Sequence, residues 1–295
     1  MIQIGDRQWS HRLALGTVQF GMDYGVSNQH GKVPRDEVRR ILDEAALAGI
    51  QLLDTASAYG SSEAVIGAAT AAGGPSFDIV SKLPPGCAAH AVETSVRASL
   101  ERLGADALYG VLVHRFEDFK DPSVRDALTG CKAQGLARRV GVSVYFPREV
   151  QWLLERDVAF DLVQLPFNLF DQRFASLLTP LRERGVQVHC RSVFLQGLFF
   201  LPPEIVRQRF PAAYEPLCHF RRTCSDAGLS VSCALLNFAL GNPGLDRVLI
   251  GVASSAELRQ NLGCYRDFRT CGALGDTFTR FGLDDEGILL PINWG

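Results

Sequence analysis

The stretch Asp54-Thr55-Ala56-Ser57-Ala58-Tyr59-Gly60 decides the fold of this chain and points to its chemistry. It follows a short, largely apolar run at residues 50–53, which is typical of a buried strand, so Asp54 stands where a strand ends. Two later strand-like runs end in the same way, one at Lys82 and the next at His114. The steps of 28 residues (54 to 82) and 32 residues (82 to 114) match the length of one strand–helix unit. Ionisable groups at three successive strand ends, with Tyr59 beside the first, therefore predict a proton-transfer site.

The same strand–helix unit recurs along the rest of the chain. Strands are predicted at residues 12–16, 50–53, 77–81, 108–113, 139–143, 161–165, 186–190 and 247–251. Helical patterns occupy residues 34–48, 62–72, 90–103, 122–134, 147–155, 174–184, 214–227, 231–240 and 255–262. This alternation predicts an α/β fold, a (β/α)8 TIM barrel, as a single domain over residues 1–295 with a short N-terminal hairpin at residues 2–9.

Two features of the pattern test this prediction. The alternative fold, a doubly wound open sheet, usually has a Gly-x-Gly-x-x-Gly turn after its first strand, and residues 16–21 lack that spacing. The interval of 60 residues from 191 to 251 is about two units long. It leaves room for an inserted loop near residues 198–210 and an extra helix.

Composition excludes several classes of protein. The 295 residues are 47% hydrophobic, which is enough for a substantial core, and the formal charge of −2 argues against nucleic acid or an anionic membrane as a partner. No apolar run approaches the roughly 20 residues of a transmembrane helix, and the N-terminus lacks the apolar core of a signal peptide, so we expect a cytoplasmic protein. The eight cysteines form no Cys-x-x-Cys pair, so we expect no structural zinc site. At this size, and with no export signal, we also expect no disulfide framework.

The four ionisable side chains suit the reduction of a carbonyl group. In a barrel the carboxyl ends of the strands converge on one face, which would bring Asp54, Lys82, His114 and Tyr59 into one pocket. A tyrosine has an ordinary pKa of about 10, which an adjacent ammonium lowers, and a carboxylate keeps that ammonium charged and oriented. A histidine can supply a hydrogen bond to a carbonyl oxygen. Such a set can donate a proton to an alkoxide formed from an aldehyde or ketone, and the missing hydride implies a nicotinamide cofactor.

Several segments, in order, resemble the aldo-keto reductase superfamily. Tyr59-Gly60-Ser61-Ser62-Glu63, followed by Ile66-Gly67, is similar to the family's Tyr-Gly-x-Ser-Glu element, and further matches are Gly16-Thr17, Gly141-Val142-Ser143, the strand of Gln164 and the Gly197-Leu198 turn. The resemblance implies that Tyr59 is the proton donor, that Lys82 and Asp54 tune it, and that His114 orients the substrate carbonyl.

The resemblance also implies a set of cofactor-binding residues. Ser143 and Gln164 match positions that bind the nicotinamide carboxamide, although the family's usual asparagine is Val144 here. Residues 250–261 resemble the pyrophosphate and adenosine segment, but Val252 replaces a cation and Arg259 is out of register with a 2′-phosphate site. NADPH is the expected cofactor, with NADH as the open alternative. The candidate cofactor-binding residues are Gly16, Thr17, Ser143, Gln164, Arg191, Ser192, Gly197, Gly251, Ser254, Gln260 and Asn261.

Two other functions fit parts of the pattern. A metal-assisted hydrolase or lyase could use Asp54, His114 and His189, although we interpret His189 as an outward-facing strand residue and predict no metal. A cofactor-sensing, non-catalytic subunit would share the fold and the cofactor. The expected partner is a small carbonyl substrate, and the expected state is a monomer or dimer. The aromatic residues that fill either the core or a substrate-facing loop are Tyr24, Tyr145, Phe167 and the cluster at residues 194–200, and Trp294 is a candidate for shaping the pocket.

Overall fold

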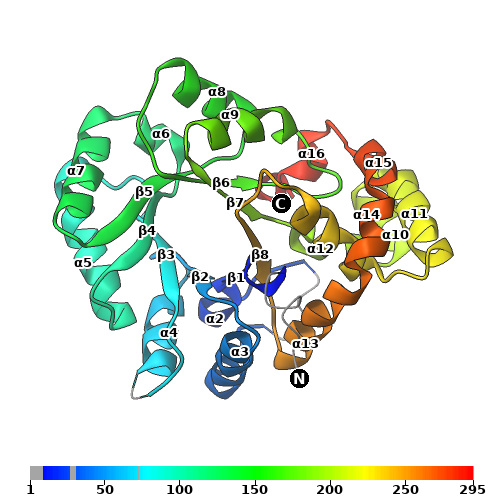
Figure 1. Cartoon of the computed structure of the whole chain (residues 1–295), viewed down its shortest axis with the longest axis horizontal. Helices are drawn as coiled ribbons and strands as arrows, with labels where there is room; N and C mark the ends of the chain where they lie inside the picture. Colours follow the sequence, from blue (N-terminus) through cyan, green and yellow to red (C-terminus); the bar gives the residue numbers. More distant parts are fainter. Residues whose placement is uncertain (1–8, 27–30, 72, 295) are drawn as a thin grey trace.

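A computed structural model describes residues 9–26, 31–71 and 73–294. Its strands close into a parallel barrel in which each strand pairs with its neighbour in sequence and the last pairs with the first (Figure 1). The strands are β1 (Leu13–Gly16), β2 (Leu52–Asp54), β3 (Asp78–Lys82), β4 (Leu108–Val113), β5 (Ala137–Ser143), β6 (Leu162–Pro166), β7 (Gln187–Arg191) and β8 (Arg247–Gly251). The (β/α)8 prediction is confirmed and the open sheet is excluded. The predicted N-terminal hairpin falls, apart from Trp9, on residues outside the described ranges.

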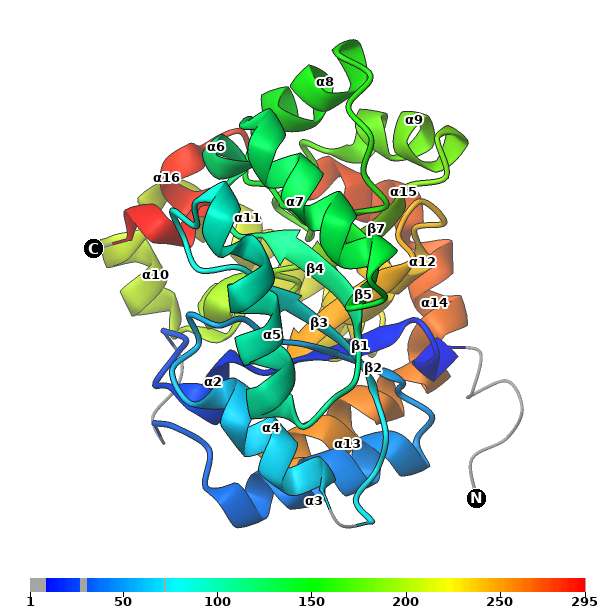
Figure 2. The same cartoon turned by 90° about the vertical axis from the view of Figure 1, so that its left-hand side faces the viewer.

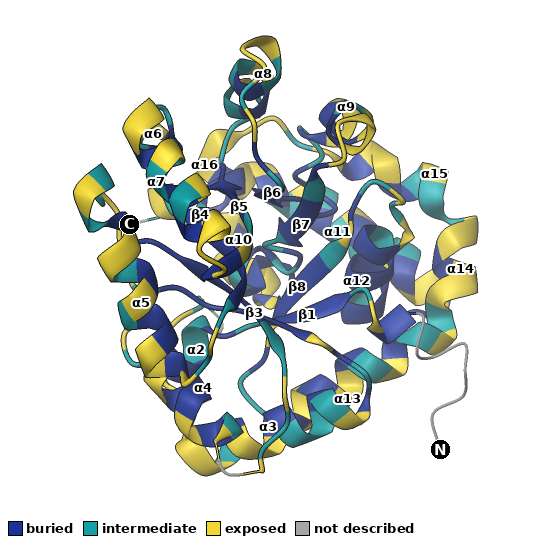
Figure 3. Ribbon diagram, turned by 60° about the vertical axis from the view of Figure 1, so that its left-hand side comes forward, coloured by how far each residue is buried: buried dark blue, intermediate teal, exposed yellow. Residues whose placement is uncertain are grey.

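Helices cover the outside of the barrel (Figure 2). Each main helix turns an apolar face inward: in α3, for example, Val38, Ile41, Leu42 and Ala45 are buried at the spacing of one helical face. Figure 3 shows this division, with buried strands inside and exposed positions on the outer helical faces. The helices are α2 (Val18–Gly21), α3 (Arg35–Leu47), α4 (Ser62–Thr70), α5 (Val92–Leu103), α6 (Phe116–Phe119), α7 (Pro122–Ala133), α8 (Pro147–Glu155), α9 (Leu178–Glu183), α10 (Pro203–Arg209), α11 (Pro211–Asp226), α12 (Val231–Gly241), α13 (Ser255–Gly263), α14 (Phe268–Ala273), α15 (Gly275–Phe278) and α16 (Glu286–Leu289).

The register of the strands brings their polar last residues to one end of the barrel. Gly16 pairs with both Asp54 and Gly251, and Ser143 pairs with Gln164. Because all strands run in the same direction, their carboxyl ends and the loops after them share one face of the molecule. This is the face that the sequence predicted to carry the site.

Part of the chain beyond β7 forms a second apolar cluster beside the barrel. The predicted inserted loop contains α10, and residues 264–293, for which no helix was predicted, form short helices that pack on α11 and α12. Phe278 and Phe281 both contact Phe220 of α11, with ring centroids 5.8 and 5.6 Å apart. Trp294 packs against Phe210 at 4.7 Å and does not line the pocket described below, so the structure does not support a pocket-shaping role for Trp294.

One disulfide departs from the expectation for the cysteines. Cys233 of α12 is bonded to Cys264, the first residue of the 3-10 helix η4 (Cys264–Asp267), with Cα atoms 4.8 Å apart. Sequence spacing gave no indication of this pair, because 31 residues separate its members and only the packing of α12 against η4 brings them together. The bond anchors the end of α13, which immediately precedes Cys264.

No single helix in the described ranges is long and apolar enough to cross a membrane. Within the described residues, α11 and α12 together reach the length and composition of a span, but the two helices meet at an angle of 94°.

Candidate active site

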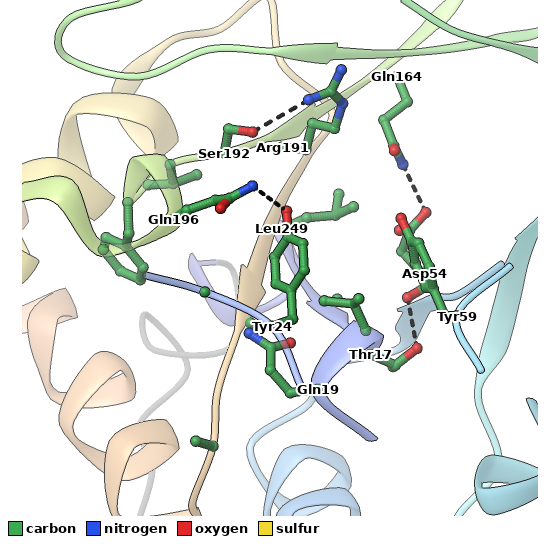
Figure 4. A pocket seen from close by; sticks show the side chains of 18 of the residues that line it. Thr17, Gln19, Tyr24, Asp54, Tyr59, Gln164, Arg191, Ser192, Gln196 and Leu249 are labelled. Carbon is green, nitrogen blue, oxygen red and sulfur yellow. Dashed lines mark hydrogen bonds between the residues drawn. The ribbon is translucent and has the colours of Figure 1, made fainter. Parts of the chain in front are cut away.

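The centre of the site is a buried ion pair between the last residues of β2 and β3. The Nζ of Lys82 donates to Oδ2 of Asp54 at 2.7 Å, and both side chains are almost completely buried, at 1% and 5% exposure. The other carboxylate oxygen, Oδ1, accepts from Nε2 of Gln164 at 2.7 Å (Figure 4). Burial alone would lower the pKa of Lys82, but the charge of Asp54 and the contact with Tyr59 outweigh burial and raise the pKa. Lys82 therefore carries a positive charge at neutral pH.

Tyr59 lies directly against this ammonium. Nζ of Lys82 is 3.4 Å from the Tyr59 hydroxyl oxygen and 4.9 Å from the centre of its ring. The turn after Tyr59 needs glycine, because Gly60 has φ of +56° and a Cβ there would lie 2.6 Å from the carbonyl oxygen of Gly21. The close approach of α2 to this turn fixes the position of the tyrosine.

Hydrogen bonds explain the other residues of the Tyr-Gly-x-Ser-Glu segment. The hydroxyl of Thr17 donates to the carbonyl oxygen of Asp54 at 2.9 Å, and the hydroxyl of Ser62 donates to the carbonyl oxygen of Thr17 at 2.9 Å. Glu63 is buried, accepts from Ser81 at 2.5 Å and forms an ion pair with Arg102 at 2.7 Å. These contacts tie the ends of β1, β2 and β3 to the start of α4, and thereby hold Asp54, Lys82 and Tyr59 in place.

His114 follows β4 and faces Tyr59. The two ring centres are 6.0 Å apart and the ring planes are nearly perpendicular, at 84°. Burial, followed by the charges of Lys82 and Arg191, lowers the pKa of His114 to about 4. His114 is therefore neutral at pH 7 and can donate one hydrogen bond without adding a charge. Its buried Nδ1 has no hydrogen-bond partner in the described part of the chain.

A cavity of about 550 Å³ extends from these four residues across the strand ends to α13. The four residues Asp54, Tyr59, Lys82 and His114, hereafter called the tetrad, line it. Ten of the eleven candidate cofactor-binding residues also line it: Gly16, Thr17, Ser143, Gln164, Arg191, Ser192, Gly197, Gly251, Gln260 and Asn261. The eleventh, Ser254, is not among the lining residues. Its hydroxyl caps α13 by accepting from the backbone N–H of Glu257 at 3.1 Å, and its role in cofactor binding stays a prediction.

The cavity fits an elongated polar cofactor. Oε1 of Gln19 lines it and is buried without a hydrogen-bond partner among the described residues, which leaves an acceptor for a ligand. A Cβ on Gly251 would lie 2.5 Å from Nε2 of Gln19 and would displace that side chain, so glycine at the end of β8 leaves room for Gln19 in the cavity wall. The residues present therefore suit a nicotinamide dinucleotide with its reactive ring at Tyr59.

Several lining residues were not predicted from the sequence. Gln19 comes from the chain after β1, and Ser232 and Glu257 come from the first turns of α12 and α13. Tyr24, for which the sequence left the core and a substrate-facing loop open, also lines the cavity. Glu257 was identifiable, because Ser254-x-x-Glu257 after a strand is the signature of a helix N-terminus at the strand-end face. Gln19 carries no such signature.

Arg191 occupies the wall beside the tetrad. Its guanidinium donates to the carbonyl oxygen of Val144 at 2.9 Å and lies 4.1 Å from the centre of the Tyr145 ring. Val144 stands at the position where the family resemblance places an asparagine. Its side chain is apolar and completely buried, so it offers the cofactor no polar contact. The backbone of Val144 serves instead to hold Arg191, which joins the ends of β5 and β7.

The interpretation of His189 as an outward-facing residue is wrong. Its side chain is fully buried, its ring is 6.4 Å from that of Tyr109, and it shares the inward face of β7 with Arg191, two residues away. Both ring nitrogens lack hydrogen-bond partners among the described residues. The same part of the chain contains no group of three potential metal ligands, so it offers no support for the metal-assisted alternative.

Lowering the pH from 7 to 5 should destabilise the fold through His189. Burial, followed by the charges of Arg247, Arg139 and Lys82, lowers its pKa to about 3, whereas an unfolded histidine titrates near 6.5. The unfolded state therefore binds more protons between these values, and stability falls by about 2 kcal/mol from this residue as the pH drops. Urea unfolding at pH 7 and pH 5 measures the difference.

The variant His189→Gln should reduce that pH-dependent loss by about 2 kcal/mol because it removes the titrating group. The control His90→Gln changes an exposed histidine and should leave the loss as in the wild type. If the stability of His189→Gln fell with pH as much as that of the wild type, His189 would not be the group responsible for the loss.

Comparison with known proteins identifies the family. The model of the Aldo/keto reductase family matches residues 12–269. The uncharacterized oxidoreductase YqkF of Bacillus subtilis (strain 168) is 27% identical over 84% of this chain and 89% of its own length. L-galactose dehydrogenase of Arabidopsis thaliana is 25% identical over 95% of this chain and 92% of its own length.

Solved structures show the same fold. The aldo-keto reductase AKR11C1 from Bacillus halodurans, in its holo form, superposes with a TM-score of 0.69 at 20% identity, covering 89% of this chain and 91% of that one. PA4992 from Pseudomonas aeruginosa gives 0.67 at 22% identity, with 88% and 90% covered. The chain therefore belongs to the aldo/keto reductase family, and it is an NAD(P)H-dependent oxidoreductase.

Proposed function

We propose that this protein reduces an aldehyde or ketone to an alcohol, with Tyr59 as the proton donor. One observation carries the proposal: a single buried ammonium, that of Lys82, contacts both the carboxylate of Asp54 and the hydroxyl of Tyr59 at the floor of the cavity. The reduced nicotinamide would supply the hydride to the carbonyl carbon. Tyr59 and His114 would then act on the carbonyl oxygen, and Asp54 and Lys82 would act through Tyr59.

Tyr59 and His114 would face the substrate oxygen. His114, neutral because of its lowered pKa, donates a hydrogen bond that polarises the carbonyl and sets its orientation. As negative charge develops on the oxygen, the Tyr59 hydroxyl transfers its proton to it, which leaves a phenolate and an alcohol. The ammonium of Lys82 stabilises that phenolate, and Asp54, held by Gln164, keeps Lys82 charged and in position. Asp54 and Lys82 therefore act through Tyr59 as positioning residues.

Ser143, Gln164 and Arg191 would hold the nicotinamide end of the cofactor, since they line the wall nearest the tetrad. NADPH is the cofactor that the family resemblance favours. The substrate would be a small carbonyl compound, because the tetrad lies at the floor of the cavity and aromatic residues form part of its outer wall: Tyr24, Tyr145, Phe194 and Phe200. We also propose that the whole chain acts as one barrel domain.

The test is to mix the protein with NADPH or NADH and each compound of a panel of carbonyl substrates. Loss of absorbance at the band of the reduced nicotinamide measures the reaction. The panel should include aliphatic and aromatic aldehydes, ketones and sugar aldehydes. L-galactose, tested in the oxidative direction, is included because one relative is named for that activity. Stoichiometric alcohol formation is expected. Tight cofactor binding without turnover on any member would instead favour the cofactor-sensing subunit.

A further inference from the structure

The positive charges of the cavity are confined to one end. Among the described residues that line it, the basic side chains are Lys82 and Arg191, and both belong to the tetrad end. The far end is formed by α13, which contributes Glu257, Gln260 and Asn261. If the nicotinamide lies at Tyr59, the adenosine half of the cofactor must reach this far end. The adenosine end therefore carries an acid and no described base.

Two hydrogen bonds hold Glu257 in the first turn of α13. One carboxylate oxygen, Oε2, accepts from the backbone N–H of Ala253 at 2.7 Å, and the backbone N–H of Glu257 donates to Ser254. Ala253 also lines the cavity, so the carboxylate is held at the cavity wall. Glu257 has no ion-pair partner in the part of the chain that the structure describes, and its charge is not neutralised by a neighbour. The second oxygen is left to accept hydrogen bonds from a ligand.

A second carboxylate, that of Glu37, accepts from another backbone amide at the start of α13. Oε1 of Glu37, from α3, accepts from the backbone N–H of Ser255 at 2.6 Å. That hydrogen bond, followed by the contact with Arg40, lowers the pKa of Glu37 to about 2, so the carboxylate stays charged. The nearest basic residue in the sequence, Arg259, forms an ion pair with Glu44 of α3 and does not line the cavity. Two amides beside the start of α13, those of Ala253 and Ser255, could have bound a phosphate but are therefore already hydrogen-bonded to carboxylates.

We infer that the far end of the cavity receives an unphosphorylated adenosine ribose, with Glu257 accepting hydrogen bonds from the ribose hydroxyls, so that NADH binds more tightly than NADPH. The inference rests on the proposed function, which places a nicotinamide dinucleotide in this cavity. A carboxylate accepts well from a ribose 2′-hydroxyl, whereas a 2′-phosphate needs a cation and is repelled by a carboxylate. Family resemblance alone favours NADPH, and the residues of this chain at α13 argue the other way.

Calorimetric titration of the purified chain with NADH, NADPH, adenosine 5′-diphosphate and adenosine 2′,5′-bisphosphate tests the inference without turnover. The expected result is a Kd for NADH at least about tenfold lower than for NADPH, because a dianion within a few ångströms of a carboxylate costs about that factor in affinity. The two adenosine fragments should differ in the same direction.

The variant Glu257→Gln distinguishes the effect of the carboxylate's charge from its structural role at the start of α13. Glutamine can still accept from Ala253 and preserve the start of α13, so a purely structural Glu257 predicts no change in the ratio of the two affinities. The inference predicts that the preference for NADH falls at least about fivefold, chiefly through tighter NADPH binding. Glu101→Gln, at an exposed position of α5, is the matched control and should leave the ratio unchanged.

An NADPH affinity equal to or greater than that for NADH would overturn this inference and leave the proposed function standing. An unchanged ratio in Glu257→Gln would also overturn it. Binding of neither dinucleotide would overturn both this inference and the proposed function.

Discussion

Replacing Tyr59 with phenylalanine is expected to lower kcat for carbonyl reduction by about 10³-fold while leaving cofactor Kd within about twofold. The substitution removes one oxygen atom, the one that lies 3.4 Å from the ammonium of Lys82. Without this hydroxyl, no described side chain beside Lys82 can donate a proton and leave a negative charge that the ammonium stabilises. The ring, which packs edge-on to His114, is retained, so the cavity keeps its shape. Steady-state kinetics on the best substrate of the panel and calorimetric titration with cofactor measure the two effects.

The matched control is Tyr109→Phe. This residue also loses a hydroxyl that makes a hydrogen bond, to Gln187 at 2.7 Å, but it lies in the barrel interior and does not line the cavity. Its kcat should change by less than about threefold, since it contacts none of the reacting groups. Turnover by Tyr59→Phe at a rate close to that of the wild type would reject Tyr59 as the acid, whatever the control shows.

The fold and the tetrad could be predicted from the sequence because both depend on short-range patterns. Each strand is a short apolar run, and a (β/α)8 barrel forces the residue that ends each run onto a common face. Asp54 and Lys82 therefore meet although 28 residues separate them. Position in the repeating unit was enough to bring them together, without any knowledge of side-chain packing.

The features that the sequence did not predict depend on contacts between distant elements. His189 was interpreted as outward-facing, yet it is buried inside the barrel against Tyr109. The pairing of β7 with β6 is unbroken from residue 187 to residue 191, so alternation places His189 on the same inward face as Arg191. Short helices within residues 264–293 are stabilised by packing on α11 and α12 and carry little periodicity of their own. The hydrogen bond from the backbone N–H of Ser255 to Glu37 joins α13 to α3 across 218 residues of sequence.

Removing the charge of Lys82 should have the largest combined effect on activity and stability. Lys82→Met is expected to lower kcat by at least about 10³-fold, because a phenolate forming at Tyr59 would face Asp54 with no cation between them. It should also lower the free energy of unfolding by about 3–5 kcal/mol, because it leaves the buried carboxylate of Asp54 without its partner, supported only by Gln164. Kinetics and urea unfolding at pH 7 measure both quantities.

A second substitution separates the two effects. In the double variant Lys82→Met with Asp54→Asn, the unpaired buried charge is gone, so most of the lost stability should return while kcat stays low. Lys132→Met is the control for loss of a lysine: its partner is Asp161 at 2.7 Å, but both side chains are well exposed, at 41% and 31%, so its cost should be below about 1 kcal/mol. If the double variant recovered turnover along with stability, the low activity of Lys82→Met would reflect a damaged fold, and the ammonium would have no role in proton transfer. If stability stayed low in the double variant, the unpaired carboxylate of Asp54 would not be the cause of the stability lost in Lys82→Met, because Asp54→Asn removes that charge.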